Sequence, residues 1–67
     1  MNDKEQFEIL KSDFINKAEK LVAEVKELQY ERLSEVGYEY NVTNARSEMV
    51  SSYANLLEFM MAVKIKL

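Results

Sequence analysis

The chain has 67 residues, with 12 Asp and Glu side chains against 9 Lys and Arg, which gives a net charge of −3 and room for one domain, residues 1–67. It contains no cysteine and no histidine, so disulfide bonds, thiolate or imidazole metal sites and the catalytic triads built on these residues are excluded. Domains below about 70–80 residues that lack such staples commonly gain stability by self-association. We therefore expect a non-enzymatic protein without cofactor or metal that associates with itself or with a partner.

Composition and spacing predict an all-α protein whose first helix covers about residues 3–36. Apolar residues make up 48% of the chain, and there is no proline and only one glycine, so few turns are possible. Apolar side chains recur at three- and four-residue intervals, which places them on one face of a helix: Phe7, Leu10, Phe14, Ala18, Leu21, Val25 and Leu28. A break near Ser12 is the alternative, because Ser can cap a new helix start.

A connecting loop is expected next, around the single glycine at position 37. Residues favouring strands alternate with small or polar ones over residues 36–43, so the loop is expected to be briefly extended. It contains Tyr38 and Tyr40. Exposed tyrosines are typical of binding surfaces, because they bring large contact area at low entropy cost. The alternative is that both rings fold over the end of the bundle and seal its core.

The second helix is predicted over about residues 44–67. Its apolar side chains follow a heptad pattern, and those expected to form the core of an oligomer are Met49, Tyr53, Leu56, Met60 and Val63. Only 6 of the 21 charged side chains lie in residues 37–67, and further apolar residues flank the pattern on both sides. The second helix should therefore be buried on more than one side.

Two helices joined by a short loop form an antiparallel hairpin. With the turn near residue 40, Leu67 would lie level with residue 14 or 15, and residues 7–14 would project beyond the second helix. One hairpin cannot cover a second helix that is apolar on both flanks. We predict that two hairpins pack as a homodimeric four-helix bundle, the alternatives being a larger homo-oligomer or a complex with another protein.

Four glutamates lie within about 80° of one another on the predicted first helix: Glu24, Glu27, Glu31 and Glu35. Negative charge near a helix C-terminus opposes the helix dipole, and like charges four residues apart repel. Since stability does not explain this placement, these glutamates are candidate partner-binding residues together with Tyr38 and Tyr40. An ordinary solvated helix face is the alternative interpretation.

The expected function is protein interaction, with a regulatory or inhibitory role that would suit an accessory protein of a phage, plasmid or bacterium. We expect it in the cytoplasm, because no signal peptide or long apolar stretch is seen. The alternative is a bundle that binds a small molecule or nucleic acid through Arg32, Arg46 and the tyrosines. Acids between the lysines of the first helix weigh against phosphate binding. Two lysines near the C-terminus are too few for a membrane-binding face.

Overall fold

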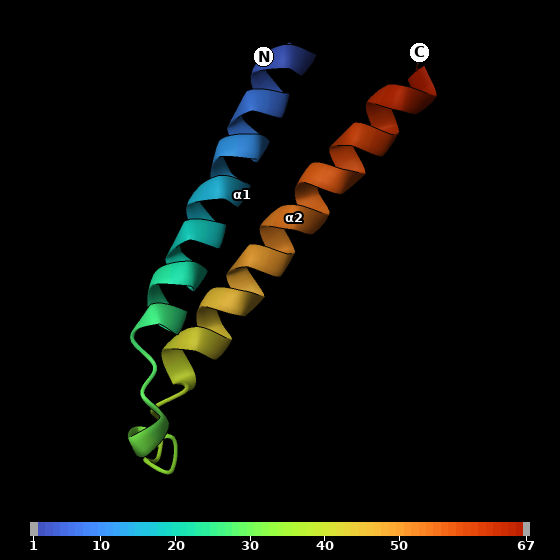
Figure 1. Cartoon of the computed structure of the whole chain (residues 1–67). Helices are drawn as coiled ribbons and strands as arrows, with labels where there is room; N and C mark the ends of the chain where they lie inside the picture. Colours follow the sequence, from blue (N-terminus) through green and yellow to red (C-terminus); the bar gives the residue numbers. More distant parts are fainter. Residues whose placement is uncertain (1, 67) are drawn as a thin grey trace.

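The structure is a computed structural model that describes residues 2–66. It contains helix α1 (Asp3–Lys26), a single 3₁₀ turn η1 (Tyr30–Arg32) and helix α2 (Tyr40–Lys66), and no strand within residues 2–66. The two helices run antiparallel, so that the first residues of α1 and the last of α2 lie at the same end of the molecule (Figure 1). The Cα trace measures 52 × 16 × 15 Å. The prediction of an all-helical hairpin is confirmed.

Helix α1 begins at a capped residue and continues without a break. The side chain of Asn2 accepts a hydrogen bond from the backbone N–H of Glu5 at 2.8 Å, which satisfies one of the free donors at the helix start. The alternative of a break near Ser12 is wrong. Here Lys17 Nζ donates to Asp13 Oδ1 at 2.8 Å along the surface of the helix. This hydrogen bond raises the pKa of Lys17 above its ordinary value.

The predicted continuation of the first helix to residue 36 is wrong, because α1 ends at Lys26. Its last turn is closed by hydrogen bonds from the N–H groups of Glu27 and Leu28 to the carbonyls three residues earlier. The two helices thereby reach nearly equal lengths, 24 and 27 residues. A longer α1 would extend past the end of its partner helix and leave its apolar face uncovered. We refer to residues 27–39, between the two helices, as the connector.

The predicted start of the second helix near residue 44 is also wrong. Helix α2 begins at Tyr40, whose N–H donates to the carbonyl of Gly37 at 3.1 Å. Gly37 has a φ of +79°, the only positive φ among the described residues. A side chain at this φ would be strained, so the glycine permits the turn that leads into α2. Tyr40 is therefore a helical residue rather than part of an extended loop.

The helices are in register along their whole length, so the predicted overhang of residues 7–14 is wrong. Phe7 shares a hollow with Phe59 and Val63 at the open end of the hairpin. The rings of Phe14 and Tyr53 have their centroids 5.6 Å apart, about halfway along the helices. The overhang was expected because a short loop was assumed. The connector instead uses residues from the predicted first helix and so shifts α2 along α1.

Helix α2 packs against α1 through a row of residues spaced by three and four: Val42, Ala45, Met49, Ser52, Leu56, Phe59 and Val63. Within this row, Ala45 is 1% and Ser52 3% exposed, and these small side chains allow the helices to approach closely. No large side chain of the described residues is fully buried. Three of the predicted core residues lie in this inner row. The other two, Tyr53 and Met60, lie beside it and are half exposed.

Candidate interaction surfaces

The four glutamates predicted to share one helix face are distributed over different elements. Glu24 lies in α1, while Glu27 caps its end, Glu31 lies in η1 and Glu35 in the following turn. The continuous acidic stripe is therefore wrong, because the helix that would carry it ends at Lys26. The structure nevertheless brings three of them to one place. A hollow of about 640 Å³ at the connector is lined by Glu24, Glu27 and Glu35 together with Tyr38.

The side chain of Tyr38 holds the connector in shape. Its hydroxyl accepts a hydrogen bond from the N–H of Gln29 at 2.8 Å and donates one to the carbonyl of Glu27 at 2.9 Å. The guanidinium of Arg32 lies 4.4 Å from the centre of the Tyr38 ring and donates to the Glu35 carboxylate at 3.1 Å. This hydrogen bond raises the pKa of Arg32. Tyr38 thus braces the connector, which differs from the sealing of the bundle core that was the structural alternative, and its role in partner binding stays a prediction.

Tyr40 and three connector side chains that sequence reasoning missed are exposed apolar residues close together in sequence, which we call the connector patch: Tyr30, Leu33, Val36 and Tyr40. Tyr30 is 85% exposed, Tyr40 is 69% exposed, and Val36 is wholly exposed. The first three were overlooked because a helix to residue 36 would have placed them among ordinary helical positions. Large apolar side chains exposed in one short segment make that segment a candidate binding site.

The connector also carries the net charge of the protein. Four of the 12 acidic side chains lie in it but only one of the 9 basic ones, Arg32, so its net charge is −3, equal to that of the whole chain. Outside the connector, eight acidic side chains are balanced by eight basic ones. This uneven distribution is visible in the sequence and could have identified the segment. The connector thus carries the two most exposed large apolar side chains, Val36 and Tyr30, and is also the acidic end of the molecule.

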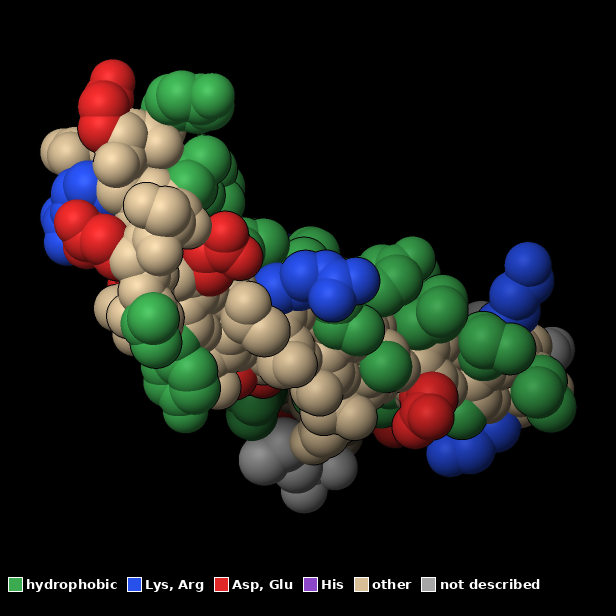
Figure 2. All heavy atoms as spheres, turned by 90° about the horizontal axis from the view of Figure 1, so that it is seen from below, with side chains coloured by type: hydrophobic (Ala, Val, Ile, Leu, Met, Phe, Trp, Pro, Cys, Tyr) green, Lys and Arg blue, Asp and Glu red, His purple; other side chains and the backbone are tan. Residues whose placement is uncertain are grey.

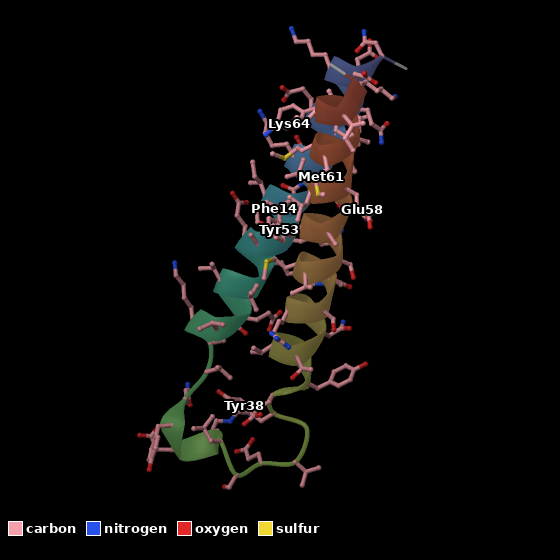
Figure 3. The ribbon with its side chains drawn as sticks, turned by 90° about the vertical axis from the view of Figure 1, so that its right-hand side faces the viewer. Phe14, Tyr38, Tyr53, Glu58, Met61 and Lys64 are labelled. Atoms are coloured by element: carbon pink, nitrogen blue, oxygen red, sulfur yellow. The ribbon has the colours of Figure 1, made fainter. Side chains whose placement is uncertain are left out.

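The two long sides of the hairpin differ in polarity. On one side, Lys20 Nζ and Glu48 Oε2 bridge the helices at 3.4 Å. Close by, a shallow polar hollow is lined by residues that include Lys17, Ser51 and Asn55. The opposite side is marked by the contact between the rings of Phe14 and Tyr53. Figure 3 shows these two side chains close together, with Glu58 on the other edge of α2.

At about 100° per residue, the helix flanks next to Phe14 and Tyr53 are apolar and lie on the same side of the hairpin. We call this side the apolar face, and its residues are Ile15, Val22, Val25, Val50, Tyr53, Leu57, Met60 and Met61. All of them are between 40% and 57% exposed. Figure 2 shows how hydrophobic side chains gather in a band along one edge of the molecule. The hairpin is therefore a two-helix layer with one polar side and one side rich in apolar residues, which also carries charged side chains such as Glu19 and Lys26.

Replacing Tyr38 by Phe is expected to destabilise the connector. The variant loses the hydroxyl that links the carbonyl of Glu27 to the N–H of Gln29. Since a typical hydrogen bond contributes about 0.5–1.5 kcal/mol, the free energy of unfolding should fall by about 1–2 kcal/mol in urea titrations. Tyr40→Phe is the matched control and should leave stability unchanged, because that hydroxyl lies on an exposed side chain. Equal stability of both variants would contradict the role assigned to Tyr38.

No group of three or more Asp and Glu side chains within residues 2–66 is arranged to hold a metal ion. Neither helix, over the part of the chain that the structure describes, combines the length and apolar character needed to cross a membrane. Comparison with protein-family models, with curated proteins and with solved structures finds no match to this chain.

Proposed function

We propose that this chain is a non-enzymatic interaction protein that acts as a homo-oligomer and binds another protein through its connector. In this proposal two hairpins form a four-helix bundle, and the connector patch with its acidic surroundings contacts the partner. The observation that carries the proposal is the coincidence, in one short segment, of the two most exposed large apolar side chains, Val36 and Tyr30, with the whole net charge. A regulatory or inhibitory role would suit a module of this kind.

Support for self-association comes from how little a single hairpin buries. Its most buried side chains are those of Ala45 and Ser52, both small. Full burial of a Leu, Val or Met side chain is worth about 1.5–3 kcal/mol, and the eight residues of the apolar face are only about half covered. A second layer of helices on this face would supply the missing burial.

Support for a protein partner comes from the chemistry of the connector. Tyr is enriched among the residues that dominate binding energy at protein interfaces. The patch residues Tyr30 and Val36 sit on a segment fixed by the hydrogen bonds of Tyr38, so little conformational entropy is lost when they bind. A net charge of −3 around them favours a partner that presents basic side chains next to an apolar surface.

Binding of nucleic acid or a phosphate-bearing small molecule has less support. The guanidinium of Arg32, which this alternative required, is hydrogen-bonded to the Glu35 carboxylate and stacked on Tyr38. The acidic connector around it would repel phosphate groups. The protein partner is therefore the function that we put forward.

The double variant Tyr30→Ser/Val36→Ser tests this function. Affinity capture with the wild-type chain should yield a partner that is purified and then titrated against both proteins. Loss of the two apolar contacts should weaken binding at least tenfold without loss of helicity, and high salt should weaken wild-type binding further. Ser51→Ala/Asn55→Ala, on the polar side of α2, is the control and should bind as wild type. Unchanged affinity of the connector variant for that partner would contradict the proposal.

A further inference from the structure

We propose that the apolar face is covered by a second copy of this chain in antiparallel orientation, with the two connectors at opposite ends of the bundle. This inference rests on the proposed homo-oligomer. It adds which side of the hairpin is buried, how the two copies are oriented and which residues lie opposite each other. It follows from three features: the size of the face, the distribution of charge along the molecule, and the position of the apolar residues on each helix.

The size of the face fits a second copy. The rod is 52 Å long and 16 Å wide, which offers an area of about 800 Å² on one side. Stable protein interfaces bury about 800 Å² on each partner. The exposed apolar residues run from Ile15 to Val25 on α1 and from Val50 to Met61 on α2, which at about 1.5 Å per residue covers about half the length of the rod. A second hairpin lying along the whole side would bury this apolar centre together with the more polar ends.

The charge distribution selects the orientation. Connectors placed side by side would bring two net charges of −3 together, and like charges at an interface are costly. The opposite end of the hairpin carries three lysines, Lys4, Lys64 and Lys66, against the two acids Asp3 and Glu5. Lys64 and Tyr38 mark these two ends in Figure 3. Antiparallel packing places each acidic connector beside the more basic end of the other copy, where the charges attract.

The position of the apolar residues sets the register. On α1 they lie on the connector side of the Phe14–Tyr53 contact, whereas on α2 most of them lie towards the open end. On α2 they lie on both sides of Tyr53, whereas on α1 they lie on one side only, so the contact between the copies is formed mainly by α2. A two-fold axis at Tyr53, in the plane of the interface and perpendicular to the helices, brings Tyr53 against the same residue of the second copy and Val50 near Leu57. Such a closed, self-complementary interface is the usual form of a homodimer.

The absence of cysteine makes the orientation measurable by single-cysteine cross-linking. Under mild oxidation, Tyr53→Cys should form disulfide-linked dimers at least tenfold faster than Val36→Cys or Asn55→Cys. A disulfide requires Cα atoms within about 7 Å, which the proposed axis gives only near Tyr53. Mixing Val50→Cys with Leu57→Cys should also give more mixed dimer than either variant forms alone. Val36 is the most exposed of these side chains, so slow linkage there cannot result from poor access.

Sedimentation equilibrium of the wild-type chain separates this inference from the proposed function. A dimeric mass with fast linkage through Tyr53→Cys supports both. A dimeric mass with fastest linkage through Val36→Cys overturns the antiparallel orientation, and fastest linkage through Asn55→Cys overturns the face, while the homo-oligomer survives. A monomeric mass overturns the second copy together with the homo-oligomer, and leaves partner binding by the connector to its own test.

Discussion

Leu56→Asp is expected to abolish the fold. Leu56 lies in the inner row of α2, against α1, where its side chain is half-buried among apolar neighbours. A carboxylate placed there without a partner costs several kcal/mol. The whole stability of so small a domain is about 3–5 kcal/mol, so the folded population should vanish. Circular dichroism should show loss of most helical signal and of a cooperative thermal transition.

Asn55→Asp is the control for this experiment, because it introduces the same carboxylate one residue earlier, on the polar side of α2. It should retain the helical signal and melt within a few degrees of the wild-type chain. A folded Leu56→Asp variant with a normal transition would show that α2 does not pack on α1 through this row.

Leu57→Asp, by contrast, is expected to leave the hairpin contact intact and to abolish self-association. Leu57 is the neighbour of Leu56, but it lies on the apolar face and is 40% exposed in the single hairpin. In a two-fold dimer the substitution places two carboxylates in one interface, so the cost is incurred twice. The dissociation constant should rise at least a hundredfold. Sedimentation equilibrium at micromolar concentration should give the monomer mass, against twice that mass for the wild type.

If the isolated hairpin is only marginally stable, the dependence of the melting temperature on protein concentration reports self-association. The melting temperature of a dimer rises with protein concentration, because association stabilises the folded state. The wild-type chain should show this dependence, and Leu57→Asp should melt lower and independently of concentration. Asn55→Asp should behave as wild type. A Leu57→Asp variant that is still dimeric would place the interface elsewhere on the molecule.

Local spacing alone was sufficient to predict the helical hairpin and the inner face of α1. Phe7, Leu10, Phe14, Ala18 and Leu21 were chosen for their three- and four-residue intervals, and all are half-buried in the structure. The sequence determines this much because these residues recur on one helix face, while most of the charged side chains of α1 lie on the other faces. The single glycine likewise marked the turn, where the backbone adopts a positive φ.

The ends of the helices depended on tertiary contacts. Residues 27–36 contain no proline or glycine and have apolar residues at helical spacing, so local propensity favours a longer α1. The structure ends it at Lys26, and the Tyr38 hydroxyl links to the backbone of Glu27, which is 11 residues distant in sequence. Such a contact has no local signal. Because of this contact, the candidate site is a folded connector and not the acidic stripe along a helix that the sequence predicted.

The side of α2 that meets α1 was also decided only by packing. Because α2 is apolar around most of its circumference, two adjacent rows satisfy the same heptad spacing, and the sequence, which predicted Tyr53 and Met60 for the core of an oligomer, did not select the row that meets α1. The structure uses the row with Ala45 and Ser52, because small side chains let the helix backbones approach closely. The larger residues are left on the exposed flank. Sequence periodicity thus determined that α2 is a helix, and the fit of side-chain volumes between the two helices determined which side of it faces inward.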